Sequence, residues 1–581
     1  MHHRRPTGGC PNPKPDSLLD LTRMLAGPVA ARLLAAYGAD VMMVNGLHLP
    51  NIEAIADTSR HPGIVVASLS AYGSQGLWAG RGGSDSMVRT ATGFNLAEAQ
   101  AAGPARRATR TRDPPDSPSC RRGERGRAGM LSWWRTARHD AGLRRQGSSM
   151  DTPTLNPLTE SQILEAVAAQ RTEALDLLSA LVAQPSLLGD EAGAQRLMAA
   201  EFAALGLRVH EFAVDENKIR DHPGYSPPIV PYEGRHNVVG IHQPQGPVLG
   251  RSLILNGHID VVPVGTASMW TTPPFQPRID GDHFYGRGAA DMKAGIVAYM
   301  QAFRALQRLG YEPAAPVYLQ SVVEEECTGN GALACLVEGY TADAAIIPEP
   351  GEGVMMAQMG VMWLTIDVYG TPVHAAYAHT GVSAIGFANY LVESLRELER
   401  VWNQPALRHA CFAGHEHPIN FNLGRIAGGE WTSSVPTHCR VDMRLGFYPG
   451  RTPAEVRAEV AAHLQAAYAA HPLHRSLRYQ ISYQGFQAQG LVVDTQQPVI
   501  QQLMQCHHDI AGSAAHLFAS TATTDVRFFH LYGNIPSTCY GPHGADIHGI
   551  DEWVSISCLQ RVTAVLALFI ARWCGLNRLA A

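Results

Sequence analysis

The chain has 581 residues, more than one hydrophobic core supports, so we expect two to four domains. Apolar residues make up 45% and charged residues 17% of the chain, which is ordinary for a soluble globular protein. The formal net charge of −5 argues against a dedicated nucleic-acid-binding protein, whose usual signature is a basic surface.

The first 149 residues have two regimes of composition. Residues 1–104 are apolar, and their patterns predict a helix followed by a strand within residues 21–44 and another strand within residues 61–73. Residues 105–149 are crowded with Arg, Pro, Ser and Gly and show no apolar periodicity, so we expect a disordered linker. A nucleic-acid-binding arm is the alternative for this Arg cluster, but no aromatic stacking pattern accompanies it.

Regular patterns resume at Met150, in a segment that we expect to extend to residue 360. Helices are predicted at residues 158–184, 192–207 and 291–310, and strands at residues 207–214, 251–264 and 315–326. Strands that alternate with helices indicate an α/β fold, with a mostly parallel sheet and helices on both of its faces. In such sheets, ligands bind at the carboxyl ends of the strands.

The pattern changes between residues 361 and 485. Strands are predicted at residues 361–370, 419–429, 438–450 and 478–485, and helices at residues 383–402 and 452–468. This order indicates a small α+β domain with an antiparallel sheet, inserted into the first domain, which resumes at residues 486–581.

The most apolar run of the chain, residues 562–570, is too short to span a bilayer, and we interpret it as part of a buried helix. The ten cysteines form no CxxC pair, which indicates reduced thiols and not a disulfide framework. The basic start of the chain is not followed by the apolar stretch of a secretory signal. We therefore expect a cytoplasmic protein without a membrane segment.

Imidazole and carboxylate side chains follow successive predicted strands. They are His258 and Asp260, Asp291, the run Glu324 to Glu326, Glu349 and His548. Each of them alone is more often structural, as Asp291 would be if it only capped a helix. Together they supply imidazole and carboxylate ligands suited to zinc or a similar divalent ion. Five ligands are too many for one tetrahedral catalytic site with an open position, but they fit two metals if one carboxylate bridges.

Six motifs in this region occur in a family's order. They are GHIDVVP, GRGAADMKAG, the EEE strand end, IIPEP, HAAYAHTGVSAI and GPHGADIHGIDEW. Over roughly residues 165–575 the chain resembles the metallopeptidase and deacylase family of acetylornithine deacetylase and succinyl-diaminopimelate desuccinylase. The resemblance implies a zinc-peptidase-like fold and a two-metal amidohydrolase that removes an acyl group from the nitrogen of an amino-acid-like substrate. Zn²⁺ is the expected metal, with Co²⁺ as an alternative.

The resemblance also implies a role for each residue. One metal would be held by His258, Asp291 and Glu349. The other would be held by Asp291, Glu326 and His548, with Asp291 bridging. Asp260 would hydrogen-bond the far nitrogen of His258, and Glu325 would be the general base. His543 is the rival of His548, but the family's ligand lies just before the DE pair at residues 551–552.

The inserted domain resembles the lid and dimerisation domain of this family, which implies a homodimer. His374 matches a histidine that reaches the oxyanion from the partner subunit, with His379 as a competing candidate. Asn422 and Arg444 match lid positions that bind the substrate's carboxylate end, for which an Arg fork is suited. A salt bridge on a strand face is the equally plausible structural role for Arg444.

Residues 1–104 resemble a truncated piece of the family III CoA-transferases, with Asp85 near the position of that family's nucleophile. The substrate-binding remainder of that family is missing, so we expect no transferase activity, and one hypothesis is that translation begins at Met150. The alternatives to a deacylase are a dipeptidase or carboxypeptidase of the same fold, a CoA-transferase and a non-catalytic scaffold. The sequence leaves the acyl group open among acetyl, succinyl and formyl.

Overall fold

The computed structural model describes residues 158–579 and two short upstream strands. The chain divides into two compact units, Met1–Arg144 and Arg145–Ala581. In the first unit the structure describes the parallel pair β1 (Ser17–Asp20) and β2 (Asp40–Met43), and β2 matches the strand predicted at the end of residues 21–44. The other elements predicted for residues 1–104, and the predicted disordered linker at residues 105–149, lie outside the described residues.

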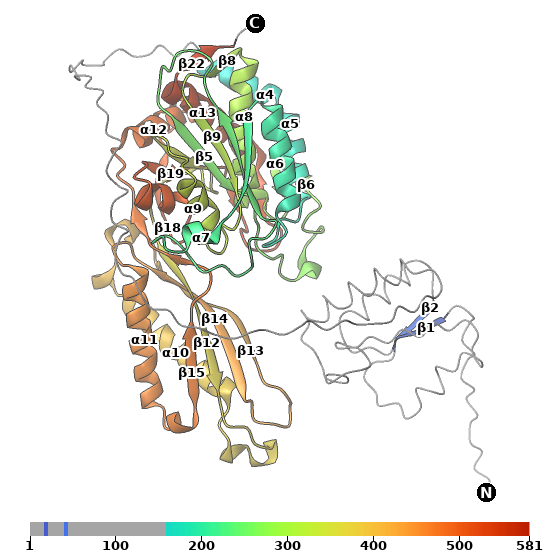
Figure 1. The fold of residues 1–581 in the computed structure, drawn as a ribbon, viewed down its shortest axis with the longest axis vertical. Helices are drawn as coiled ribbons and strands as arrows, with labels where there is room; N and C mark the ends of the chain where they lie inside the picture. The colour runs from blue at the N-terminus through green and yellow to red at the C-terminus, as the bar shows by residue number, and fades with distance from the viewer. Residues whose placement is uncertain (1–16, 21–39, 44–157, 580–581) are drawn as a thin grey trace, which may run out of the picture. The chain divides into compact units, whose positions relative to one another are not determined.

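The second unit is built on a six-stranded sheet (Figure 1). Its strands, in spatial order, are β19 (Ser537–Cys539), β10 (Ala345–Ile347), β5 (Leu253–His258), β9 (Val317–Val322), β4 (His236–His242) and β3 (Arg208–Ala213). The first four strands are mutually parallel, whereas β4 runs antiparallel to both of its neighbours, β9 and the edge strand β3. The predicted α/β fold with a mostly parallel sheet is therefore confirmed.

Helices cover both faces of this sheet. A Cβ atom at Gly257 of β5 would meet Ile296 and Tyr299 of α8 (Ala294–Arg308) on one face. On the opposite face, the Asn237 side chain of β4 donates a hydrogen bond to a backbone oxygen of α9 (Asn330–Val337). Because both faces are covered, β5 is buried along its whole length, as a continuous apolar strand of a parallel sheet should be.

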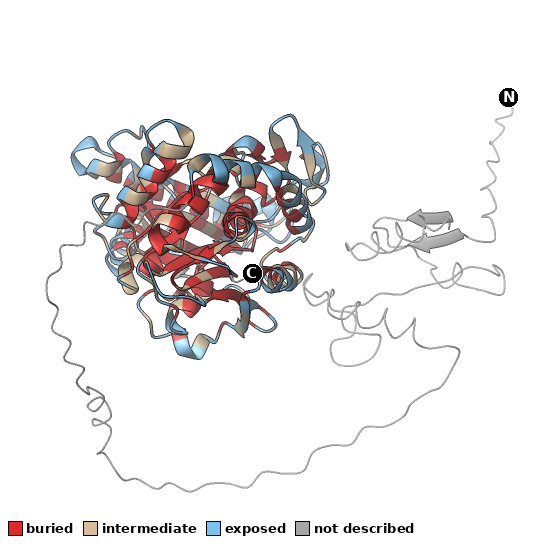
Figure 2. Ribbon diagram, turned by 90° about the horizontal axis from the view of Figure 1, so that it is seen from above, coloured by how far each residue is buried: buried red, intermediate tan, exposed pale blue. Residues whose placement is uncertain are grey.

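The remaining helices of this domain are α4 (Glu160–Ala169), α5 (Arg171–Val182), α6 (Ala192–Ala204), α7 (Glu216–Ile219), α12 (Pro498–Ala511) and α13 (Ile556–Cys574). Within the part of the chain that is described, α13 is the one helix long and apolar enough to cross a membrane by length and composition. Most of its residues are buried in the protein core, in line with the buried helix that the sequence predicts. Figure 2 shows the buried residues gathered in the interior of the described unit.

Two local predictions were wrong. The single helix predicted over residues 158–184 is two helices, α4 and α5, that meet at Gln170. The buried Gln170 side chain donates to the backbone oxygen of Gln301 in α8, so the break has a tertiary cause. No strand was predicted between residues 214 and 251, yet β4 lies there.

The inserted domain, called the lid below, begins at β12 (Gly360–Tyr369) and ends at β15 (Arg478–Ser482). Its antiparallel sheet has the order β13 (Phe421–Gly428), β14 (His438–Phe447), β12, β15, with β16 (Gln487–Ala488) also pairing with β12. The helices α10 (Ala384–Trp402) and α11 (Pro453–Ala470) pack on one face of this sheet over a separate apolar core. The other face of the sheet carries polar side chains and is turned partly toward the first domain (Figure 1).

Three small sheets complete the described unit. They are β17 (Leu491–Val492), β11 (Gly353–Gln358) and β18 (His516–Ser520); β20 (Gly544–Ala545), β21 (Trp553–Ser555), β7 (His283–Tyr285) and β6 (Arg278–Asp280); and β22 (Leu576–Arg578) with β8 (Tyr311–Pro313). The second of these sheets brings the C-terminal loop at residues 546–552 against the chain that leads into α8.

Candidate active site

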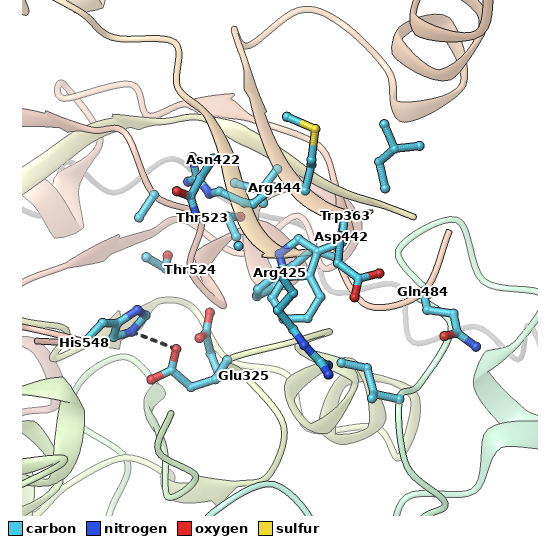
Figure 3. A pocket seen from close by; sticks show the side chains of 18 of the residues that line it. Glu325, Trp363, Asn422, Arg425, Asp442, Arg444, Gln484, Thr523, Thr524 and His548 are labelled. Atoms are coloured by element: carbon cyan, nitrogen blue, oxygen red, sulfur yellow. Dashed lines mark ion pairs between the residues drawn. The ribbon is translucent and has the colours of Figure 1, made fainter. Parts of the chain in front are cut away.

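A pocket of about 590 Å³ lies between the carboxyl edge of the main sheet and the polar face of the lid (Figure 3). The sheet side is lined by Asp291, Glu325, Glu326, Glu349 and His548. The lid side is lined mainly by Trp363, Thr365, Asn422, Arg425, Asp442 and Arg444. The pocket therefore collects residues that are far apart in the sequence, such as Asp291 and His548, which are separated by 257 positions.

The acids and imidazoles of the pocket wall come from neighbouring parallel strands. His258 ends β5, Glu325 and Glu326 follow β9, and Glu349 follows β10. These three strands are adjacent in the sheet, so their carboxyl ends meet at one edge. Asp291 lies in the short segment Ala289–Lys293 that leads into α8, where its own backbone angles, φ −113° and ψ 97°, are not helical. His548 lies in the loop between β20 and β21.

Asp291 lies between the two histidines and offers one carboxylate oxygen to each. Its Oδ1 is 3.2 Å from Nε2 of His258, which is also 3.8 Å from Oε1 of Glu349. Its Oδ2 is 3.5 Å from Nε2 of His548, which is 3.1 Å from Oε2 of Glu326. The two predicted ligand sets are thus brought together, with Asp291 shared between them.

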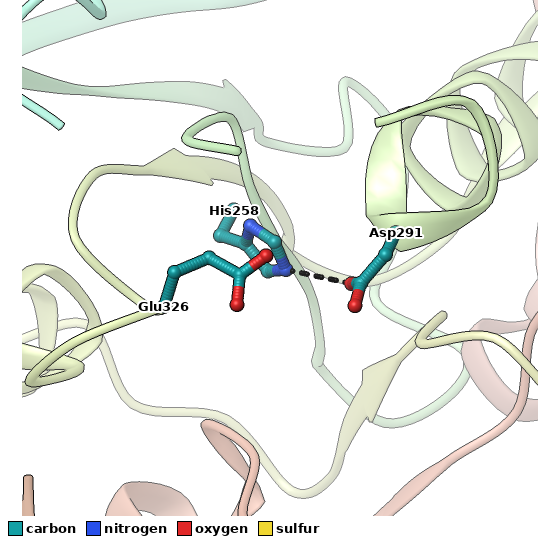
Figure 4. Close-up of side chains that lie close together, drawn as sticks. All are labelled: His258, Asp291 and Glu326. Atoms are coloured by element: carbon teal, nitrogen blue, oxygen red, sulfur yellow. Dashed lines mark hydrogen bonds and ion pairs between the residues drawn. The ribbon is translucent and has the colours of Figure 1, made fainter. Parts of the chain in front are cut away.

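The ligand atoms are close enough to serve a common ion. Those of His258, Asp291 and Glu326 all lie within 4.8 Å of one another (Figure 4). The candidate ligand atoms of His258, Glu325 and Glu349 also lie within 4.8 Å of one another. Two imidazoles, together with carboxylates from two strand ends and from the segment that leads into α8, form a nitrogen and oxygen donor set of the kind that zinc prefers.

The electrostatics of this cluster call for added positive charge. Burial raises the pKa of Glu349 well above its ordinary value, and the charge of Asp291 raises it further. Burial lowers the pKa of His548, but Glu326 and Asp291 raise it more, to about 11. The imidazoles thus take up protons to offset the crowded carboxylates. Two divalent cations would supply that charge instead, so the residues present fit a two-metal site.

Asp260 holds the site together in a different way from the predicted one. The far nitrogen of His258, Nδ1, lies 2.9 Å from the backbone oxygen of Asp260, whereas the nearest carboxylate oxygen is 3.7 Å away. The Asp260 carboxylate instead accepts hydrogen bonds from the backbone N–H groups of Glu325 and Glu326, both at 3.1 Å. The predicted side-chain hydrogen bond to His258 is therefore wrong in its acceptor atom, because the carboxylate is occupied by the neighbouring strand end.

Glu325 projects into the pocket from a buried backbone. Its Oε1 atom has no hydrogen-bond partner among residues 158–579. Burial raises the pKa of Glu325 well above its ordinary value, and the buried Asp525 raises it further. A carboxylate with a raised pKa and a free oxygen has the properties of a general base that must also return its proton.

The predicted lid residues divide into two groups. Asn422 and Arg444 line the pocket, and Arg444 donates to the backbone oxygen of Thr521 at 2.9 Å with no salt bridge in the described structure. His374 and its rival His379 are exposed and do not line this pocket. Near the C-terminus, His548 contacts the acidic cluster, whereas the ring of His543 packs edge-on against Trp553.

Glu552, which follows His548 in the DE pair, is not among the predicted site residues, yet it fixes the backbone of the site. Its buried carboxylate accepts backbone N–H groups from Gly288, Ala290 and Asp291, and it pairs with the buried Arg287. The Glu552 carboxylate is thus the electrostatic partner of the GRG sequence at residues 286–288. The DE pair at residues 551–552 was the available signal for it.

Two glycines allow the Glu349 segment to approach the candidate metal ligands. A Cβ atom at Gly295, at the start of α8, would lie 2.0 Å from the backbone oxygen of Pro348. A Cβ atom at Gly541 would lie 2.3 Å from the backbone oxygens of both Pro348 and Glu349. Only glycine permits this approach of three backbone segments, which accounts for the last glycine of the GRGAADMKAG motif.

Comparison with known proteins agrees with this geometry. The chain is 29% identical over 439 residues to an N-formyl-4-amino-5-aminomethyl-2-methylpyrimidine deformylase of Halalkalibacterium halodurans, covering 72% of this chain and 98% of the relative. It is 28% identical to a succinyl-diaminopimelate desuccinylase of Thioalkalivibrio sulfidiphilus, covering 69% and 99%. The fold is similar to that of the dipeptidase Dug1p from Saccharomyces cerevisiae, with a TM-score of 0.60, 12% identity and coverage of 71% and 98%.

These similarities give no support to the predicted CoA-transferase resemblance of residues 1–104. The model of peptidase family M20/M25/M40 matches residues 254–572, which contain every ligand named above. The chain therefore belongs to peptidase family M20/M25/M40 and is a metal-dependent amidohydrolase.

Proposed function

We propose that this protein hydrolyses the amide bond of N-acyl amino acids or related N-acyl amines and that it works with two divalent cations, Zn²⁺ in the first place and Co²⁺ as a substitute. The observation that carries the proposal is the shared Asp291, which directs one oxygen toward each histidine. The names of the sequence relatives, a deformylase and a desuccinylase, support removal of an acyl group from nitrogen.

His258, Asp291 and Glu349 would hold one cation, and Asp291, Glu326 and His548 the other. Two such cations, when bound, would lower the pKa of a water and stabilise negative charge on the carbonyl oxygen. Glu325 accepts the proton of the attacking water at its carboxylate. It then delivers that proton to the leaving nitrogen, which departs as a neutral amine.

Other residues would orient the substrate. Asn422 and Arg444 line the lid side of the pocket, where an amide and a guanidinium suit a substrate carboxylate. In the role implied by the family resemblance, His374 would act on the oxyanion of a partner subunit, so we propose a homodimer. We also propose a cytoplasmic location, with no nucleic acid or membrane among its partners.

The test is hydrolysis by the zinc-loaded chain of a panel of N-formyl, N-acetyl and N-succinyl amino acids and amines, measured by release of the free amine. Dipeptides form the second arm of the panel, because the fold is also similar to that of a dipeptidase. We expect turnover of at least one N-acyl compound that a chelator abolishes and added Zn²⁺ or Co²⁺ restores. Turnover of dipeptides alone would contradict the deacylase proposal, while the protein would still be a metal-dependent hydrolase.

A further inference from the structure

The lid side of the pocket carries more positive than negative charge. Three arginines line it, Arg425, Arg440 and Arg444, against the single carboxylate of Asp442. A pocket wall that carries more charges of one sign than of the other favours ligands of the opposite charge.

Two of these three guanidinium groups already have partners within the protein. Arg444 donates to the backbone oxygen of Thr521 at 2.9 Å. Arg440 donates through Nε to Oδ1 of Asp442 at 3.1 Å. Among residues 158–579, no hydrogen bond or ion pair involves the guanidinium of Arg425.

The lack of a partner for Arg425 follows from the fold of the lid. Arg425 on β13 lies directly across from Asp442 on β14, the position from which a carboxylate would neutralise it. The Asp442 carboxylate is occupied instead, since it accepts the hydroxyl of Thr365 at 2.7 Å and the Nε of Arg440. The pair β13–β14 thus carries the charged Arg425 guanidinium, while the carboxylate opposite it, that of Asp442, is bonded to Thr365 and Arg440.

A β-bulge turns Arg425 toward the pocket. The pairing of β13 with β14 shifts register between Leu423 and Arg425, so the strict alternation of faces is broken there. Without the shift, Arg425 would share the face of Leu423, which packs against the lid core. With it, Arg425 joins Asn422 in lining the pocket, and Figure 3 shows its side chain extending from the lid into the pocket, on the side of Glu325.

We propose that Arg425 is a specificity-determining residue that binds a second anionic group of the substrate, a carboxylate, in addition to the group held near Arg444. This inference rests on the proposed deacylase function and narrows its substrate class to N-acyl compounds with a carboxylate on the acyl arm or on the amine side chain. A guanidinium suits such a group because it presents several donors in a plane.

Two pairs of substrates, each differing only in this charge, test the inference on the zinc-loaded chain. N-acetyl-L-glutamate and N-acetyl-L-glutamine vary the amine side, and N-succinyl-L-alanine and N-succinamoyl-L-alanine vary the acyl arm. We expect the anionic member of one pair to have a kcat/KM about tenfold higher, mainly through KM, as is typical of one charge-assisted contact. Arg425→Gln should reduce this preference to within twofold and leave the neutral member unchanged, and Arg425→Lys should retain part of the preference.

Arg478→Gln is the matched control, since Arg478 is an arginine of the same lid sheet whose guanidinium stacks on Tyr369 and does not line the pocket. It should keep the preference. Equal kcat/KM values in both pairs, or an equal loss for both members of a pair in Arg425→Gln, would overturn the inference. So would an equal loss of preference in Arg478→Gln, which would assign the selectivity to overall charge.

A second readout separates this inference from the proposed function. If no N-acyl compound is hydrolysed, the deacylase proposal fails, and binding of glutarate and glutaramate to the same variants is measured by calorimetry. Tighter binding of glutarate that is lost in Arg425→Gln would support the anion site, and unchanged binding in that variant would refute it.

Discussion

The carboxylate of Glu552 accepts a hydrogen bond from the backbone N–H of Asp291 at 3.0 Å, across 261 positions of sequence. The same carboxylate accepts the N–H groups of Gly288 and Ala290 and pairs with Arg287. One buried acid therefore fixes the backbone of the turn from which the bridging carboxylate projects. In metal sites, such supporting contacts determine how well the ligands are oriented.

Glu552→Gln should destabilise the fold and weaken metal binding together. The amide has one acceptor oxygen in place of two, and it leaves the buried Arg287 without a counter-ion. We expect a loss of about 3–5 kcal/mol in the free energy of unfolding, measured by denaturant titration, because breaking a buried ion pair strands a charge. Zinc affinity should fall by about 10- to 100-fold.

Asp551→Asn is the control for that variant. Asp551 is the adjacent acid, and its carboxylate bonds Thr271 without contacting the Asp291 turn. It should cost less than about 1 kcal/mol and leave zinc affinity unchanged. Equal metal affinities in native and Glu552→Gln protein would show that Glu552 does not position Asp291.

Glu325→Gln should remove turnover while the metals stay bound. The change keeps the shape of the side chain but takes away the proton acceptor, and Glu325 is absent from both proposed ligand sets. We expect kcat to fall by about 10²–10⁴-fold. Metal content by elemental analysis should equal that of the native chain. A rate near the native one would rule out Glu325 as the general base.

The shared position of Asp291 predicts an unequal effect on metal content. Asp291→Ala removes a ligand from both sets, so it should leave less than one zinc per chain after gel filtration. His548→Ala removes a ligand only from the set with Glu326, so one zinc should remain. Elemental analysis with protein quantification measures both ratios. Equal loss in the two variants would contradict a bridging Asp291.

Much of the fold was predictable because the residues that a helix or strand buries recur at regular spacing in the sequence. The alternation of strands and helices indicated the parallel sheet, and the change of pattern at residue 361 indicated the lid. Contacts made across the fold leave no such record. The break at Gln170 depends on a hydrogen bond to Gln301 in another helix, which no pattern within residues 158–184 can reveal.

The same distinction applies to the site. The metal-ligand candidates could be named because they follow apolar strands whose ends must meet at one edge of the sheet. The hydrogen-bond acceptor for Nδ1 of His258 could not be predicted. The sequence does not say whether Asp260 presents its carboxylate or its backbone oxygen to that nitrogen. Arg425 escaped notice because simple alternation places it on the buried face, and only the bulge in β13 turns it outward.

Asp525, which the sequence did not single out, is expected to set the pH dependence of activity. It is buried, and neither carboxylate oxygen has a hydrogen-bond partner in the described structure. Burial raises the pKa of Asp525 from its ordinary 3.8 to about 7, against the opposing effect of Arg527. Its negative charge also adds to the burial that raises the pKa of Glu325.

Asp525→Asn should therefore lower the pKa of Glu325. The general base then stays ionised to lower pH, so the acidic limb of kcat/KM against pH should move to lower pH in the zinc-loaded variant. An unmoved limb, or one that moves to higher pH, would contradict this electrostatic link between the two acids.

Stability should respond to the same residue with a definite sign. Because folding raises the pKa of Asp525, its contribution to stability is fully present below about pH 4 and is lost as the pH rises through about 7. Asp525→Asn has no titrating carboxyl group at this position and does not lose this stability. The difference in free energy of unfolding, variant minus native, should therefore increase from pH 4 to pH 8, by at most about 4 kcal/mol. Denaturant titrations of both metal-free proteins at four pH values measure the difference. A difference independent of pH would mean that Asp525 is ionised in the folded protein throughout, and that another group holds its charge.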